Sequence, residues 1–180
     1  MGLVWPFTIR HTGTNFLFAN LRQMGFKQIG ETFVETVRNN GSLNFYHQHL
    51  DIKHNFNLVG DDPVIITMRN PINVYRSHVW RGRIKANPEW YERIMLKSFH
   101  DIDGLMKFFN SYLFQVDAED KREEAECLSR WLGIKDWNYK EQDATANTAM
   151  NVPNTMNVKA QALYDNPPNS IKELANQYGY

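Results

Sequence analysis

The chain has 180 residues, enough for one domain with a sizeable hydrophobic core. Its 20 Lys and Arg residues balance 20 Asp and Glu residues, which argues against bulk attraction to nucleic acid or to a membrane surface. No stretch approaches the ~20 apolar residues of a membrane-spanning helix, and a lone Cys127 excludes an internal disulfide framework. We therefore expect a single cytoplasmic domain over residues 1–180 that binds neither nucleic acid nor membrane.

A strand followed by a helix opens the chain. Residues Leu3–Ile9 are apolar and β-favouring. Pro6 should lie near the start of this strand or at a sheet edge, because proline cannot donate to a strand ladder. Thr14 or Asn15 can cap the helix that follows, and Gly25 is expected to end it.

Two further strands and two helices are predicted in the middle of the chain. Residues 26–42 show no clear pattern, but Leu43–His49 favours a strand, and Pro63–Met68 is the clearest buried strand. A helix is expected over Asn73–Trp80. A longer one over residues 88–110 carries an apolar stripe typical of core packing.

The last third of the chain predicts one strand and two capped helices. Tyr112–Val116 favours a fourth strand, and Asp120–Glu123 forms a capping box for a helix that ends at Gly133. An Asn- and Thr-rich loop is expected over residues 138–157, before a second capping box at Ser170–Glu173. The alternation of strands and helices predicts a three-layer α/β domain with a mostly parallel central sheet.

Two segments suggest a function, Arg10–Leu17 and Arg69–Ser77. Each follows an apolar strand and opens a helix, so each points backbone N–H groups and the positive end of a helix dipole at one place. Two such places in a small domain indicate a ligand with two separated anionic groups. A nucleotide with a phosphate at each end of its ribose is such a ligand.

These segments resemble the 5′-phosphosulfate loop and the 3′-phosphate motif of sulfotransferases that use 3′-phosphoadenosine 5′-phosphosulfate (PAPS). The first family motif reads basic, Ser/Thr, Gly, Thr/Ser, variable, aromatic, Leu, and is met by His11–Leu17. The second, Arg-Asn-Pro with a Ser eight positions after the Arg, is met by Arg69–Pro71 and Ser77. Arg130–Ile134 resembles the close of the helix after the family's last core strand. The resemblance implies a P-loop-like fold and PAPS as donor, with 3′-phosphoadenosine 5′-phosphate (PAP) as product. It also implies no metal, and a small-molecule or glycan acceptor.

The resemblance also implies which residues bind the donor. Backbone N–H groups of residues 12–16, with nearby side chains, would hold the 5′-phosphate, and an Arg fork with a Ser hydroxyl would hold the 3′-phosphate. His11 stands where the family usually carries Lys or Arg, so it is expected to donate a hydrogen bond to the departing phosphate. The predicted donor-binding residues are Arg10, His11, Thr12, Gly13, Thr14, Asn15, Phe16, Arg69 and Ser77.

The expected catalytic residues are His49 and His11. His49 ends the second predicted strand, 20 positions before Arg69. Many family members place a catalytic His followed by Leu at about this point. A neutral imidazole can accept a proton from an acceptor hydroxyl or amine. His47 shares the face of His49 on a regular strand, and Asp51 is an alternative base.

Other functions remain open from the sequence. The His11 substitution and the lack of the family's C-terminal phosphate loop, for which Lys159 is the candidate, also fit a module that binds the nucleotide without catalysis. A P-loop kinase is disfavoured, because the first segment lacks Gly-x4-Gly-Lys-Ser/Thr. His47, His49 and His54 could instead form a metal site, although their spacing matches no firm template. The sequence predicts neither the acceptor nor the oligomeric state.

Overall fold

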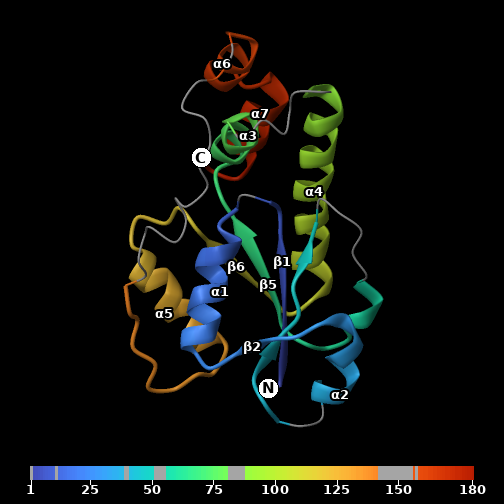
Figure 1. Ribbon diagram of the computed structural model, residues 1–180, viewed down its shortest axis with the longest axis vertical. Coiled ribbons are helices and arrows are strands. Elements are labelled where there is room, and N and C mark those ends of the chain that lie inside the picture. Colours follow the sequence, from blue (N-terminus) through green and yellow to red (C-terminus); the bar gives the residue numbers. More distant parts are fainter. Residues whose placement is uncertain are drawn as a thin grey trace.

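The computed structural model shows an α/β domain in which a parallel sheet lies between helices (Figure 1). It describes residues 2–10, 12–38, 41–50, 56–80, 88–141, 156 and 158–180. Among the strands in these ranges the sheet order is β2-β3-β1-β5-β6, with β4 also pairing with β1, and every pairing is parallel. The predicted α/β class with a mostly parallel sheet is confirmed, and its P-loop-like character stays a prediction.

The strands are short and the helices vary widely in length. The strands are β1 Leu3–Thr8, β2 Lys27–Gln28, β3 Asn44–Phe45, β4 Gln48–His49, β5 Val64–Met68 and β6 Ser111–Gln115. The α-helices are α1 Thr14–Gln23, α2 Val34–Arg38, α3 Pro71–Trp80, α4 Pro88–Phe108, α5 Lys121–Trp131, α6 Val158–Asp165 and α7 Asn169–Gln177. Two 3₁₀ turns lie at Glu31–Phe33 and Phe56–Leu58.

Different helices cover the two faces of the sheet. Leu3, Trp5 and Phe7 of β1 pack into a core shared with α2 and α4. Val4 packs instead into a second core shared with α1 and α5. This split follows from the two-residue period of a strand, and Figure 1 shows the helices on opposite sides of the sheet. β1 and β5 are buried along their whole length, as expected of central strands covered on both faces.

Pro6 lies in the middle of a central strand, so the expectation of a strand start or a sheet edge is wrong. The carbonyls of Val4 and Thr8 accept hydrogen bonds from the N–H groups of Tyr46 (3.1 Å) and Leu50 (2.8 Å). Pro6 lies midway between Val4 and Thr8. Because the backbone groups of a strand alternate in direction, those of Pro6 point toward β3 and β4, as those of Val4 and Thr8 do. Its missing N–H therefore meets the sheet where β3 has ended and β4 has not begun. This explains why the strand predicted over Leu43–His49 is split in two.

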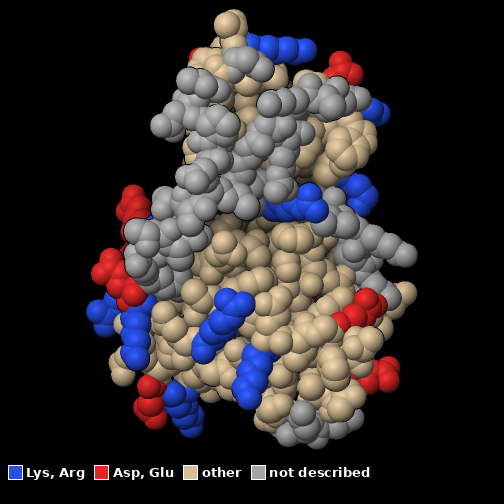
Figure 2. All heavy atoms as spheres, viewed as in Figure 1, with Lys and Arg blue, Asp and Glu red and all other residues tan. Residues whose placement is uncertain are grey.

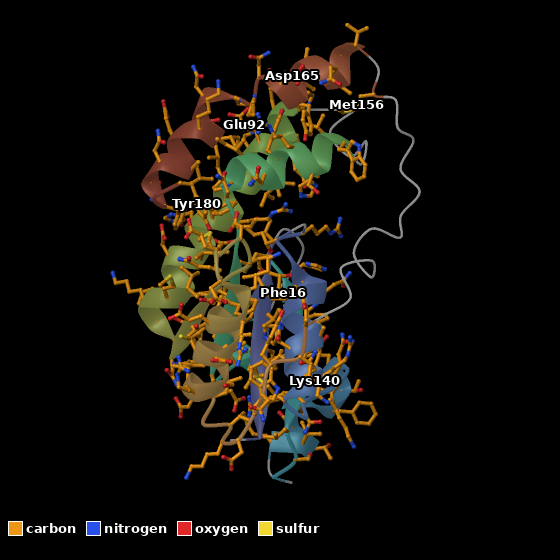
Figure 3. All side chains as sticks on the ribbon, turned by 90° about the vertical axis from the view of Figure 1, so that its left-hand side faces the viewer. Phe16, Glu92, Lys140, Met156, Asp165 and Tyr180 are labelled. Atoms are coloured by element: carbon orange, nitrogen blue, oxygen red, sulfur yellow. The ribbon has the colours of Figure 1, made fainter. Side chains whose placement is uncertain are left out.

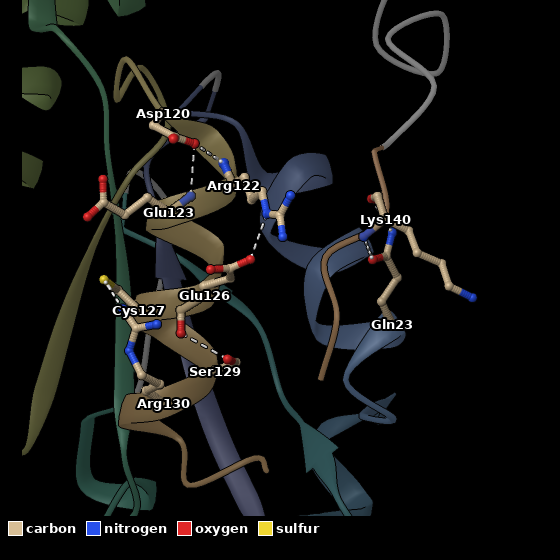
Figure 4. Close-up of polar contacts among 9 residues, drawn as sticks. All are labelled: Gln23, Asp120, Arg122, Glu123, Glu126, Cys127, Ser129, Arg130 and Lys140. Atoms are coloured by element: carbon tan, nitrogen blue, oxygen red, sulfur yellow. Dashed lines mark hydrogen bonds and ion pairs between the residues drawn. The ribbon is translucent and has the colours of Figure 1, made fainter. Parts of the chain in front are cut away.

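The predicted cap of α5 is confirmed (Figure 4). Asp120 Oδ1 accepts hydrogen bonds from the N–H groups of Arg122 and Glu123, each at 2.9 Å. Figure 4 also shows how the segment after α5 is held against α1. The side-chain amide of Gln23 donates to the carbonyl of Lys140 (3.2 Å) and accepts from its N–H (3.3 Å).

The cap predicted at Ser170 is wrong. Pro168 occupies the N-cap position of α7 without a side-chain hydrogen bond, and Ser170 is already helical. The Ser170 hydroxyl instead donates to Glu92 of α4. The sequence pattern also missed α6, which begins directly after the predicted loop. Of that loop, residues 142–155 and 157 lie outside the described residues.

Three helices, α3, α6 and α7, lie together beyond the carboxyl ends of the strands (Figure 1). Arg76 of α3 donates from Nε to the carbonyl of Tyr164 in α6 (3.1 Å). The hydroxyl of Tyr178, just after α7, reaches the carbonyl of Phe99 in α4 (2.9 Å). Figure 3 shows the same arrangement from the side, with Met156 in the upper part of the molecule and Phe16 below it on α1.

No helix in the described part of the chain is long and apolar enough to span a membrane. On the face drawn in Figure 2, acidic side chains lie mainly toward the edges, whereas Lys and Arg side chains also lie across the middle. Positive and negative side chains are therefore unevenly distributed over this face, although their numbers are equal in the whole chain.

Candidate functional site

A cavity of about 1320 Å³ lies at the carboxyl ends of the strands. Its walls include Arg10 after β1, His49 at the end of β4, Arg69 after β5 and Val116 after β6. Open α/β sheets bind ligands at this edge, because the loops that leave the strands converge there. The lining residues are Arg10, Gly13, Thr14, Asn15, Phe16, Phe18, His47, His49, Arg69, Ser77, Trp90, Tyr91, Val116, Asp117, Ala118 and Lys121.

Most of the site residues predicted from the sequence line this one cavity. They are Arg10, Gly13, Thr14, Asn15 and Phe16 from the first segment, Arg69 and Ser77 from the second, and His49. His11, predicted both to bind the donor and to assist catalysis, lies outside the described residues, as does the alternative base Asp51. Lys159, on α6, is exposed and is not among the residues that line the cavity.

Thr12 does not line the cavity, which corrects its expected role as a side-chain ligand. It is fully buried. Its hydroxyl donates to the carbonyl of Ile9 (2.5 Å) and lies 2.5 Å from the hydroxyl of Thr67 in β5. Thr12 therefore shapes the loop after β1 and fastens it to the neighbouring strand.

The backbone donors of the first segment are fewer than the sequence predicts. The N–H of Thr12 donates to the carbonyl of Ile9 (3.2 Å), and the N–H of Phe16 donates to the carbonyl of Gly13 (2.9 Å). No acceptor among the described residues takes the N–H groups of Gly13, Thr14 and Asn15. These three donors, at the N-terminus of α1, are the ones available to an anion in the cavity.

Asn70 positions the second segment. Its side-chain Oδ1 accepts a hydrogen bond from the N–H of Ile72 (2.9 Å), which caps α3, and Pro71 fills the first helical position. Its own N–H donates to Asp117 Oδ2 (2.9 Å), in the loop after β6. The Asn-Pro pair that follows Arg69 therefore starts α3 and ties this loop to the end of β6.

The described lining carries more positive than negative charge. Its Lys and Arg side chains are Arg10, Arg69 and Lys121, and its one carboxylate is Asp117. The ammonium of Lys121 lies 5.9 Å from the ring centre of Phe16, within range of a cation–π contact. A cavity with this balance favours an anionic ligand.

A polar cluster around Thr8 forms one wall of the cavity. His47 and His49 lie two residues apart, as the strand pattern predicts for side chains on one face, and both reach the hydroxyl of Thr8. The Oγ1 atom of Thr8 lies 2.7 Å from His47 Nε2 and 3.1 Å from His49 Nδ1. The hydroxyl of Thr14, at the start of α1, donates to the same oxygen at 3.1 Å.

His47 is neutral under ordinary conditions. Burial, together with the neighbouring His49, lowers the pKa of His47 to about 3. Its ring also packs edge-on against Phe18, with ring centres 4.8 Å apart. The described residues contain no group of three or more His, Cys, Asp or Glu side chains placed to hold a metal ion, and His54 lies outside them.

The sequence interpretation missed several lining residues. Val116, Asp117 and Ala118 directly follow a predicted strand, so the rule that ligands bind at the carboxyl ends of parallel strands could have found them. Phe18, Trp90, Tyr91 and Lys121 carry no such signal, because their approach to the cavity depends on how α1, α4 and α5 pack.

Comparison of the chain with protein-family models, with curated proteins and with solved structures finds no match in any of the three.

Gly13→Ala should destabilise the protein. Gly13 has a φ of 79°, a left-handed conformation that costs other residues about 1–2 kcal/mol. An added Cβ would also lie 2.2 Å from Cγ1 of Val116, and such overpacking costs about 1–3 kcal/mol. Urea unfolding of Gly13→Ala in the wild-type and Val116→Ala backgrounds separates the two effects. The cost should be smaller in the second background, and an equal cost in both would contradict the Val116 contact.

His47 should make stability depend on pH. Its pKa is about 3 in the folded protein and about 6.5 in the unfolded chain, so between about pH 6.5 and pH 3 mainly the unfolded chain takes up this proton. The free energy of unfolding should therefore fall between pH 7 and pH 5 by about 2 kcal/mol more in the wild type than in His47→Gln. Denaturant unfolding at both pH values measures this difference.

His100→Gln is the matched control, because the side chain of His100 is exposed to solvent in the folded protein. A pH dependence of His47→Gln equal to that of the wild type would contradict the burial of His47 as a neutral group.

Proposed function

We propose that this chain is a PAPS-dependent sulfotransferase with the P-loop-like fold of that family. It would move a sulfuryl group in line from PAPS to a hydroxyl or amine of a small-molecule or glycan acceptor, with PAP as product and without a metal. The observation that carries the proposal is that Gly13 and Arg69, 56 positions apart in the chain, line the same cavity.

The cavity suits an anion at two separated places. At the first, the N–H groups of Gly13, Thr14 and Asn15 stand at the positive end of α1. At the second, the guanidinium of Arg69 and the hydroxyl of Ser77 belong to the end of β5 and to α3. The volume of about 1320 Å³ exceeds the roughly 300–1,000 Å³ of ordinary small-molecule sites, which leaves room for an acceptor beside the donor.

The residues of the site divide the work of the transfer. His49 takes the acceptor's proton while the acceptor oxygen or nitrogen forms its bond to sulfur, a role that typically contributes ~10²–10⁴-fold. The bond between sulfur and the 5′-phosphate oxygen breaks, and its electron pair leaves with PAP. Arg10 and the N-terminus of α1 stabilise the charge that gathers on that oxygen. His11, next to Arg10, would donate a hydrogen bond to the same phosphate.

Incubation with PAPS and a panel of phenols, alcohols, amines and saccharides tests the activity. PAP should appear only when an acceptor is present, together with the sulfated acceptor by mass spectrometry. If the protein binds PAP tightly but forms no PAP from PAPS with any acceptor in the panel, a nucleotide-binding module is favoured instead. A larger thermal stabilisation by ATP with magnesium than by PAP would favour a kinase.

Arg69→Ala should weaken PAP far more than adenosine 5′-monophosphate, because the two nucleotides differ only in the 3′-phosphate. Charge-assisted hydrogen bonds contribute about 1.5–3 kcal/mol, which corresponds to about 10- to 150-fold in the dissociation constant of PAP. Isothermal titration calorimetry measures both nucleotides. Arg93→Ala is the control, since Arg93 is exposed on α4 and does not line the cavity. An equal loss for both nucleotides would refute the role given to Arg69.

A further inference from the structure

The hydroxyl of Thr8 stands at the centre of three polar side chains, and none of the sequence motifs points to it. Thr8 ends β1 and is fully buried. Its neighbours come from two other parts of the fold. His49 belongs to β4 and His47 directly precedes that strand, whereas Thr14 lies at the start of α1. Because Thr8 pairs in register with His49 across the sheet, the backbone itself holds this arrangement.

The number of hydrogens in this cluster limits how they can be placed. A hydroxyl has one hydrogen to donate and two lone pairs that accept. The hydroxyl of Thr14 donates to Thr8 and uses one lone pair. Thr8 can then donate to only one imidazole and must accept from the other. One imidazole therefore accepts from the shared oxygen and the other donates to it. Because His47 meets this oxygen through Nε2 and His49 meets it through Nδ1, both rings then carry their hydrogen on the same kind of nitrogen.

The distances indicate which imidazole accepts. Hydroxyl donors make shorter hydrogen bonds, about 2.7–2.8 Å, than N–H donors, about 2.9–3.0 Å. The 2.7 Å separation between Thr8 Oγ1 and His47 Nε2 fits a bond donated by the hydroxyl. The 3.1 Å separation between Thr8 Oγ1 and His49 Nδ1 fits a bond donated by the imidazole. In this arrangement the hydrogen of His49 is on Nδ1, and Nε2 carries a lone pair.

We propose that Thr8 is a positioning residue that holds His49 in its Nδ1–H tautomer and so directs the basic Nε2 to the reaction. This inference rests on the proposed sulfotransferase function. The acceptor's proton passes to Nε2, the electron pair of the broken O–H or N–H bond stays with the acceptor atom, and that atom forms the bond to sulfur. The Nδ1–H of the resulting imidazolium keeps its hydrogen bond to Thr8.

His47 supports this arrangement because it stays neutral. Its burial beside His49 lowers its pKa to about 3, so it accepts a hydrogen bond from Thr8 without drawing the proton away from His49. A protonated His47 would have no lone pair for the Thr8 hydroxyl. Both imidazoles line the cavity, and the positive charge formed during the reaction therefore stays on His49.

Nuclear magnetic resonance of ¹⁵N-histidine-labelled protein tests the tautomer directly, at a pH where the histidines are neutral. Two-bond ¹H–¹⁵N correlations distinguish protonated from unprotonated ring nitrogens, and His47→Gln and His49→Gln assign the signals. In the wild type, His49 should carry its hydrogen on Nδ1. In Thr8→Val, which replaces the hydroxyl with a methyl group, His49 should shift to the Nε2–H form. Thr8→Ser should keep the wild-type signals.

Turnover with PAPS gives a second readout. Thr8→Val should lower kcat about tenfold or more with little change in the KM for PAPS, and Thr8→Ser should restore most of kcat. Thr32→Val, at an exposed position, controls for the substitution itself. An Nε2–H tautomer of His49 in the wild type would overturn the proposal, as would an Nδ1–H tautomer that survives in Thr8→Val. The spectra need no turnover, so a chain that is inactive with PAPS would refute the proposed function separately.

Discussion

A contact between two buried threonine hydroxyls fixes the candidate site. Thr12 belongs to the loop after β1, Thr67 is the next-to-last residue of β5, and their Oγ1 atoms lie 2.5 Å apart. The Thr12 hydroxyl also donates to the carbonyl of Ile9, so the loop is closed on itself before it meets the strand. Thr12 precedes Gly13, and Thr67 lies two residues before Arg69. One buried contact therefore sets the distance between the two segments that the sequence singles out as anion-binding.

A second tie reaches the site from the far end of the described chain. Asp117 accepts from the N–H of Asn70 through Oδ2 and from the hydroxyl of Tyr180 through Oδ1 (3.1 Å). Burial, with the nearby Asp117 carboxylate, raises the pKa of Tyr180, which keeps this hydroxyl protonated as a donor. Two donors thus occupy the one acidic side chain of the described lining. The cavity retains a carboxylate without exposing it fully to an anionic ligand, and the segment after α7 helps to hold the loop after β5.

Local patterns predicted the parts of the fold that depend on local chemistry. The sequence predicts β1 and β5 because continuous apolar residues are typical of strands buried on both faces. It predicts the cap at Asp120 because the carboxylate accepts from two N–H groups of its own helix. The predicted position of Pro6 is wrong. A proline fits inside this central strand only because the neighbouring strand is interrupted, and no local sequence pattern records that interruption. The cap at Ser170 was wrong because Glu92, distant in sequence, takes its hydroxyl. Lys121 and Trp90 were missed for the same reason, since only helix packing brings them to the cavity.

The order of the strands separates the two kinds of chemistry in the site. β1 lies at the centre, with β4 paired on one side and β5 on the other. The imidazoles of His47 and His49 accordingly lie on one side of the loop after β1, and Arg69 lies on the other. Gly13 follows β1 in the same cavity, where its φ of 79° strains any other residue and Val116 leaves no space for a Cβ. In the proposed reaction the sulfuryl group of a donor held at Gly13 and Arg69 has to come within reach of His49, on the side of β4. A proton acceptor is needed on that side, and the hydroxyl of Thr8 is there to orient it.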